Sequence, residues 1–236
     1  MQKISADETG VKMIFFDIDN TLIDYDASEK NAVTELFKEK YDISLNDEQV
    51  QYWHTISKKY FDKYLQGELT FQEQGKKRFC EMTDFCGRNT EENENELLFC
   101  DYQFLLEKSW ALFGDVNDAI KLLKNFRLGI ISNGKSKQQK TKLLCTNIDD
   151  YFEIQLFSED IGKAKPCEDI FLEAVRKSGE KINDIIYVGD NVITDIVPCE
   201  KIGIKSVLID RKGESDSCHT TINNLCELEK LVKKWR

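Results

Sequence analysis

Short unbroken runs of apolar residues recur along the chain and predict strands that are buried on both faces. They lie at residues 13–16, 128–131, 185–188 and 206–209. Strands of a parallel sheet covered by helices have this continuous pattern, because neither face meets water. Helical apolar spacing separates the later runs, as in residues 116–125 and 170–178. Strands that alternate with helices predict an α/β fold with a doubly wound parallel sheet.

The stretch between the first two runs has a different pattern. Residues 24–107 contain no strand-like run and no proline, and apolar residues recur there at helical spacing. We expect helices around residues 32–37 and over about residues 46–66, 70–83 and 91–107. This pattern predicts an all-helical cap domain at residues 24–107, inserted into a core domain of residues 1–23 and 108–236. The polar residues 1–10 are expected to form a loose tail.

Length, composition and charge limit the class of protein. The 236 residues, of which 41% are hydrophobic and 32% charged, suffice for one large domain or a core with an insert. The formal net charge of −10 argues against a nucleic acid polymer as partner, yet permits a small anionic substrate beside a local cation. No segment reaches the roughly 18 apolar residues of a membrane span, and none resembles the apolar core of a signal peptide. With eight cysteines and no CxxC pair, we expect a cytoplasmic protein with reduced thiols and no membrane contact.

Two acidic pairs directly follow predicted strands. The first strand ends in the pattern DxDxT, formed by Asp17, Asp19 and Thr21, and the third leads into Asp190 and Asp195. Side chains two residues apart on an extended backbone point the same way, and ligand sites in open α/β sheets lie beyond the carboxyl ends of the strands. Taken alone, DxDxT is equally consistent with a solvated turn.

Two further groups of residues complete the set. Ser132 and Asn133 follow the second strand and offer a hydroxyl and amides to phosphate oxygens, and Lys165 precedes Pro166 at an expected helix start. Each has a purely structural explanation, such as a helix cap for Ser132 or a surface position for Lys165. Four such groups in this order, three of them directly after apolar strands, favour a functional site.

The order DxDxT, SNG, KP and GDxxxxD resembles the four motifs of the haloacid dehalogenase superfamily. The core resemblance covers residues 12–23 and 108–212. It implies a Rossmann-like doubly wound sheet with an inserted all-α cap.

Other segments narrow the resemblance to one subfamily. Residues 112–116, 131–134 and 157–162 resemble members whose helical cap lies between the first two motifs. Residues 67–79 are similar to the pyrimidine-nucleotidase-like members. Two departures, Asp115 where proline is common and residues 198–200 in place of a run of small residues, touch no catalytic position.

The resemblance implies phosphoryl transfer to a carboxylate. Asp17 would attack phosphorus and form an aspartyl-phosphate. Asp19 would protonate the leaving alcohol and then activate the water that cleaves the intermediate. Mg²⁺ would be held by Asp17, the Asp19 backbone carbonyl and Asp190, while Asp195 would orient Lys165 or a metal-bound water.

The implied phosphate ligands are Thr21, Ser132, the Asn133 amide and Lys165. The implied reaction is hydrolysis of a small phosphorylated metabolite, with a nucleoside 5′-monophosphate as the first expectation and a sugar phosphate as the alternative. A phosphomutase would keep Asp17, Asp19 and Lys165 but retain the phosphate on a bisphosphate intermediate. Outside the enzymes, a catalytically silent protein that binds a ligand or partner is the alternative.

Two side-chain types suggest other chemistry and are set aside. His54 and His219 have no partners at metal-ligand spacing, which argues against zinc. The cap aromatics could stack on a base, but we interpret them first as the core of the cap itself; they are Tyr52, Trp53, Tyr60, Phe61, Tyr64 and Phe71.

Overall fold

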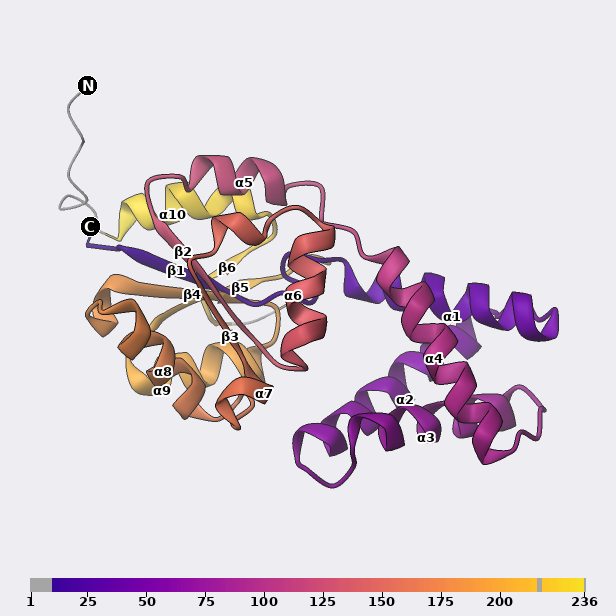
Figure 1. Ribbon diagram of the computed structural model, residues 1–236. Helices are drawn as coiled ribbons and strands as arrows, with labels where there is room; N and C mark the ends of the chain where they lie inside the picture. Colours follow the sequence, from indigo (N-terminus) through magenta and orange to yellow (C-terminus); the bar gives the residue numbers. More distant parts are fainter. Residues whose placement is uncertain (1–9, 216–217, 236) are drawn as a thin grey trace. The chain divides into compact units, whose positions relative to one another are not determined.

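The structure, a computed structural model, describes residues 10–215 and 218–235. The expected loose tail over residues 1–10 therefore lies, except for Gly10, outside the described residues. The chain folds into two compact units (Figure 1). The core unit comprises the chain up to Asp24 and from Leu112 onward, and the helical unit comprises Tyr25–Ala111.

The core unit contains a parallel sheet of six strands in the order β3-β2-β1-β4-β5-β6. The strands are β1 (Met13–Phe16), β2 (Arg127–Ser132), β3 (Ile154–Phe157), β4 (Ile185–Gly189), β5 (Lys205–Ile209) and β6 (Thr221–Ile222). The four apolar runs form β1, β2, β4 and β5, which confirms the doubly wound α/β core. The sequence pattern missed β3 and β6 because β3 is only partly buried and β6 is two residues long, as edge strands often are.

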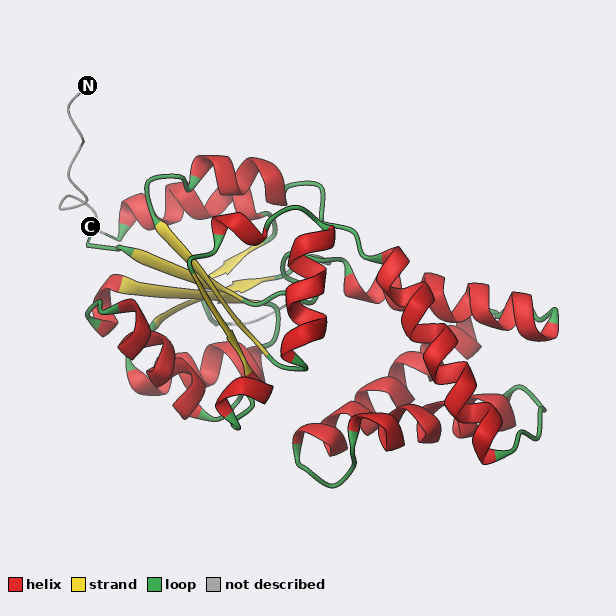
Figure 2. Ribbon diagram, viewed as in Figure 1, coloured by secondary structure: helices red, strands yellow, loops and turns green. Residues whose placement is uncertain are grey.

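Helices cover both faces of this sheet (Figure 2). On one face lie α5 (Val116–Leu122) and α10 (Leu228–Lys234), and on the other α8 (Glu168–Ser178) and α9 (Val197–Ile202). The remaining helical segments are α6 (Ser136–Cys145), α7 (Ser158–Ile161), η2 (Asp149–Tyr151), η3 (Ile182–Asp184), η4 (Val192–Ile196) and η5 (Leu225–Glu227). Because neighbouring strand residues point to opposite faces, Met13 and Phe15 pack with Phe171 of α8, whereas Phe16 meets the ring of Phe152. Helices thus cover both faces of the sheet in the described part of the chain, and a site is expected at the ends of its strands.

The helical unit consists of α1 (Tyr25–Tyr41), α2 (Asp47–Leu65), α3 (Phe71–Phe85) and α4 (Glu92–Ser109). Asn46 and Thr70 are the N-caps of α2 and α3, each in a capping box, so both helices begin where a polar side chain satisfies the first free N–H groups. Trp53 is completely buried, with the rings of Phe79 and Tyr102 at 4.9 and 5.0 Å. Trp53 therefore belongs to the core of the helical unit itself.

A buried charged network crosses the helical unit. The carboxylate of Glu29 accepts hydrogen bonds from Arg78 at 2.6 Å and from the Tyr102 hydroxyl at 3.2 Å, and His54 Nδ1 lies 3.0 Å away. The Arg78 guanidinium also lies over the Trp53 ring, 4.6 Å from its centroid. Burial alone would raise the pKa of Glu29, but the His54 hydrogen bond and the Arg78 charge outweigh it and lower that pKa.

Candidate active site

The strand order places the carboxyl ends of β1 and β4 next to each other. From this pair the sheet extends one way through β2 and β3 and the other way through β5 and β6. At such a reversal the following connections leave on opposite faces of the sheet and open a crevice. Asp17 follows β1 there and Asp190 follows β4, and the Asp17 N–H donates to the Val188 carbonyl at 2.9 Å. The topology therefore joins two aspartates that are far apart in sequence.

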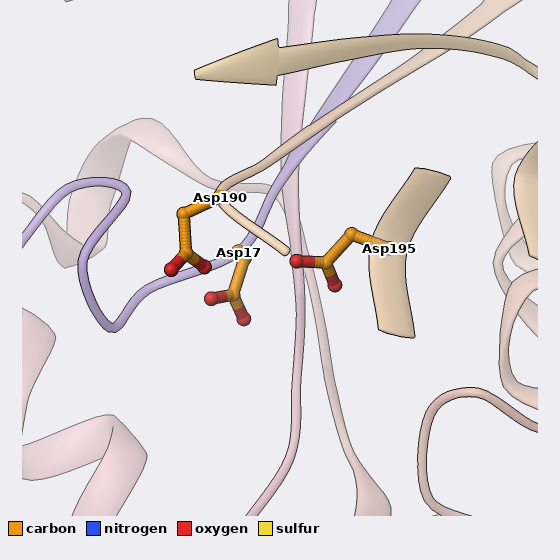
Figure 3. Close-up of side chains that lie close together, drawn as sticks. All are labelled: Asp17, Asp190 and Asp195. Carbon is orange, nitrogen blue, oxygen red and sulfur yellow. The ribbon is translucent and has the colours of Figure 1, made fainter. Parts of the chain in front are cut away.

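Asp17, Asp190 and Asp195 form an acidic cluster (Figure 3). One carboxylate oxygen of each lies within 4.8 Å of the others. Asp17 and Asp195 are only 6% and 1% exposed, so the cluster is largely shielded from water. Asp195 comes from η4, a single π-helical turn, which is a geometry often found at functional sites.

Lys165 is the buried cation of this cluster. Its Nζ donates to Asp17 Oδ1 at 2.7 Å, to Asp195 Oδ1 at 2.7 Å and to the Tyr187 hydroxyl at 2.8 Å. Burial by itself would lower the pKa of Lys165, but Asp17 and Asp195 more than compensate and raise it. The amine is thus a fixed positive charge that orients two carboxylates.

One ammonium does not neutralise three carboxylates, and the remaining negative charge contributes to raised pKa values of two of them. Burial, together with the charge of Asp195, raises the pKa of Asp17 to about 6 against the opposing effect of Lys165. Burial and the Asp17 carboxylate raise the pKa of Asp190 to about 8. A site in which carboxylates resist ionisation gains most from a further cation.

Ser132, the last residue of β2, and Asn133, which follows it, make different contacts in the structure. The Asn133 side chain makes two hydrogen bonds to the backbone of Lys165, one to its carbonyl at 3.0 Å and one from its N–H at 2.8 Å. This side chain therefore holds the Lys165 loop, and a phosphate contact from Asn133 would come from its main-chain N–H. The Ser132 hydroxyl accepts from Gln139 at 3.1 Å. The Thr21 hydroxyl is buried and has no hydrogen-bond partner among the described residues, as expected of a group that awaits a ligand.

The carboxylate of Asp19 lies against α6 and is not part of the acidic cluster. Lys142 Nζ contacts both of its oxygens, at 2.6 and 2.7 Å, and Gln139 Nε2 lies 3.2 Å from Oδ2. Lys142, Gln139 and Tyr187 contact these site residues but were not predicted from the sequence pattern. A signal for the first two was present, since Ser136, Gln139 and Lys142 recur at helical spacing directly after the SNG motif.

Comparisons with known proteins agree with this geometry. A family model of haloacid dehalogenase-like hydrolases matches residues 11–203, and the chain belongs to this family. The chain is 27% identical to the pyrimidine 5′-nucleotidase YjjG of Escherichia coli over 226 residues, which cover 94% of this chain and 97% of that protein. It is 33% identical to the glyceraldehyde 3-phosphate phosphatase of Methanocaldococcus jannaschii over 116 residues, 47% of this chain and 50% of that protein.

A solved structure shows the same fold over almost the whole chain. The magnesium-bound crystal structure of the putative HAD-hydrolase YfnB from Bacillus subtilis matches with a TM-score of 0.81 at 24% identity, covering 94% of this chain and 98% of that one. Together these findings confirm the expected superfamily, the α/β core with a helical cap, and an enzyme of the phosphatase class. Across the described residues, every helix is too short or too polar to span a bilayer.

Proposed function

We propose that the chain is a Mg²⁺-dependent phosphatase that hydrolyses small phosphate monoesters through a phosphorylated Asp17. The observation that carries this proposal is the difference in hydrogen bonding between the two oxygens of the Asp17 carboxylate. Lys165 holds its Oδ1, while Oδ2 accepts no hydrogen bond from the described part of the chain. A carboxylate fixed at one oxygen and open at the other is oriented to attack phosphorus.

The donor set of the cluster fits Mg²⁺. Mg²⁺ prefers oxygen ligands and is held by a few carboxylates together with water. We assign it to the carboxylates of Asp17 and Asp190 and to the backbone carbonyl of Asp19. Asp195 is the outer residue, because both of its oxygens already accept hydrogen bonds from protein donors. When bound, the ion supplies the positive charge that lets an anionic carboxylate approach an anionic phosphate.

In the first step, Asp17 attacks phosphorus and the bond from phosphorus to the alcohol oxygen breaks. The hydroxyls of Thr21 and Ser132, the N–H of Asn133 and the ammonium of Lys165 would share the charge on the transferring oxygens. Asp19, in its protonated form, gives its proton to the leaving oxygen. Such protonation typically contributes about 10² to 10⁴ in rate.

In the second step, Asp19 acts as the base, because it has given its proton to the leaving oxygen in the first step. It takes a proton from a water molecule, whose oxygen attacks phosphorus and releases Asp17 with inorganic phosphate. The protonated Asp19 is then ready for the next substrate, so one residue serves both steps.

For the substrate, we propose a nucleoside 5′-monophosphate, with the helical unit as the cap domain that selects it. This choice is supported by the likeness to a pyrimidine 5′-nucleotidase, which extends over nearly the whole chain. A sugar phosphate is the second candidate, supported by the likeness to a glyceraldehyde 3-phosphate phosphatase, which covers about half of each chain.

The test is phosphate release from a panel of nucleoside monophosphates and sugar phosphates. Wild-type protein should release phosphate with Mg²⁺, lose this activity in excess chelator, and be inhibited by Ca²⁺, whose larger and looser coordination misplaces the nucleophile. Asp17→Asn should fall to background while its circular dichroism stays unchanged. Activity of Asp17→Asn within tenfold of wild type, or full activity in chelator, would overturn the proposal. Phosphate retained on a bisphosphate product would indicate a phosphomutase, and ligand binding without turnover would indicate a silent binding protein.

A further inference from the structure

The inward face of α6 is unusually polar for a helix that is partly buried in the core unit. Its buried residues are Ser136, Gln139 and Lys142, joined by only one apolar residue, Leu143. A helix in this position normally buries an apolar stripe. Lys142 is 2% exposed, and an ammonium group taken out of water is strongly unfavourable unless an anion meets it in good geometry. Polar residues buried here therefore indicate a specific partner.

That partner is the side chain of Asp19. The ammonium of Lys142 lies almost equally far from both carboxylate oxygens, at 2.6 and 2.7 Å, so it defines the direction of the whole carboxylate. Gln139 adds a contact to Oδ2 at 3.2 Å. Asp19 itself is on the turn after β1, where the next residue, Asn20, has a positive φ of 59°. The backbone of this turn is specified locally, but the carboxylate is held by a helix that begins more than a hundred residues later in the chain.

Gln139 also links this carboxylate to the end of β2 and the residue after it. The same Nε2 lies 3.1 Å from the Ser132 hydroxyl and 2.7 Å from the Asn133 carbonyl. The held position of Asp19 is therefore beside the groups assigned above to the phosphate. A residue that exchanges a proton with the leaving oxygen must lie at such a position.

We infer that Lys142, assisted by Gln139, is the positioning residue of Asp19. The inference rests on the proposed role of Asp19 as acid and base. A general acid must lie within hydrogen-bond reach of the oxygen it protonates, and a displacement of about 1 Å can reduce the rate about 10²-fold. Lys142 acts through Asp19, so its loss should affect the steps that need a proton and leave substrate binding nearly unchanged.

The first arm of the test is Lys142→Met, with Lys137→Met as its matched control. Lys137 is an exposed lysine of the same helix, so the control makes the same chemical change without touching Asp19. With an alkyl phosphate, Lys142→Met should lower kcat by about 10- to 10²-fold and leave KM within about twofold. With an aryl phosphate whose phenol needs no protonation, it should give a burst of phenol followed by a slow steady rate, because only the water-activation step suffers. Lys137→Met should match wild type with both substrates.

The second arm is a double-mutant cycle with Asp19→Asn, which removes the group that Lys142 is inferred to position. In this background Lys142→Met should change kcat by less than about twofold. Lys142→Arg, which keeps a cation able to meet both oxygens, should recover most of the activity lost in Lys142→Met. The cycle also controls for partial misfolding, since a general structural defect would lower activity in both backgrounds.

The outcomes separate the inference from the function on which it rests. If Asp19→Asn alone shows equal losses with both substrates and no burst, the proposed role of Asp19 fails. If Asp19→Asn shows the burst and leaving-group dependence but Lys142→Met equals Lys137→Met, only the inference fails. It also fails if Lys142→Met lowers kcat by a similar factor with and without the Asp19 carboxylate.

Discussion

Removal of the Lys165 ammonium should destabilise the core unit strongly, and more so at high pH. Lys165→Met keeps most of the side-chain volume and removes the charge. Lys165 is 5% exposed, and its Nζ is held by three oxygens at 2.7, 2.7 and 2.8 Å. In the variant, Asp195, itself 1% exposed, keeps as donors among the described residues the Tyr187 hydroxyl and the Asn191 N–H, both at 3.1 Å.

The expected magnitude follows from the burial of both partners. Breaking a buried ion pair by removing one partner costs about 3–5 kcal/mol, because the remaining charge stays out of water without compensation. Hydrogen bonds from a hydroxyl and an amide reduce this penalty only in part. We therefore expect the free energy of unfolding of the core unit to fall by about 3 kcal/mol or more at pH 8 without metal.

The pH dependence has a definite sign. The pKa of Asp17 is already raised above 3.8, its value in the absence of the fold, and loss of Lys165 raises the pKa of this carboxyl further. A group with a raised pKa in the folded state binds its proton more tightly there than in the unfolded state. Its destabilising effect is absent at low pH and grows as the pH rises towards the folded pKa. The difference between variant and wild type should therefore be larger at about pH 8 than at about pH 6.

Hydrogen exchange of β1 and β4 amides, in chelator and corrected for the intrinsic rate at each pH, measures this difference within the core unit. Measurements at about pH 6 and about pH 8 also stay above the sequence isoelectric point of about 4.9. Lys163→Met is the matched control, since Lys163 is exposed and two residues away. A loss below 1 kcal/mol at pH 8, or a larger loss at pH 6, would refute the reasoning.

Three further predictions concern both units. Because burial and a neighbouring carboxylate raise the pKa of Asp190 to about 8, Mg²⁺ binding at pH 7 should release about one proton and strengthen as the pH rises. Calorimetry in buffers of different ionisation enthalpy measures the number of protons released, and binding without proton release contradicts the prediction. Arg78→Met should destabilise the helical unit by about 3–5 kcal/mol by leaving Glu29 buried without its cation, and further substitution of Glu29→Gln should recover part of this loss in urea unfolding. Gly75→Ala should destabilise the same unit by about 1–3 kcal/mol, because the added Cβ would lie 2.2 Å from the ring of buried Phe99; thermal melting that matches or exceeds wild type contradicts this.

The sequence pattern predicted those parts of the fold that are governed by local rules. The central strands are continuous apolar runs because helices cover both faces of the sheet. The starts of α2 and α3 were visible because Asn46 and Thr70 satisfy free N–H groups within the next three residues. The edge strands β3 and β6 lacked such a signal, since short and partly exposed strands share their composition with loops.

The candidate site was predictable to a similar extent. Asp17, Asp190 and Lys165 could be proposed because they belong to four groups in a fixed order, and Asp17 and Asp190 directly follow strands whose carboxyl ends lie side by side. Gln139 and Lys142 recur with Ser136 at helical spacing, but this signal does not identify a site by itself, because polar residues at such spacing usually form a solvated face. Their burial depends on the packing of α6 beside the turn after β1, which only tertiary structure reveals.

The central claim, that Asp17 carries the phosphate during turnover, is tested most directly by trapping the intermediate. An acyl phosphate on a carboxylate is reduced by borohydride to an alcohol, which would convert a phosphorylated Asp17 into homoserine at that position. The Asp19→Asn variant is used to slow the second step, and the protein is quenched with borohydride during turnover of an aryl phosphate. Mass spectrometry should then find homoserine in place of aspartate in the peptide that contains Asp17 and nowhere else. Protein quenched without substrate should show none. Turnover without any trapped residue, or a label on a different side chain, would contradict the account.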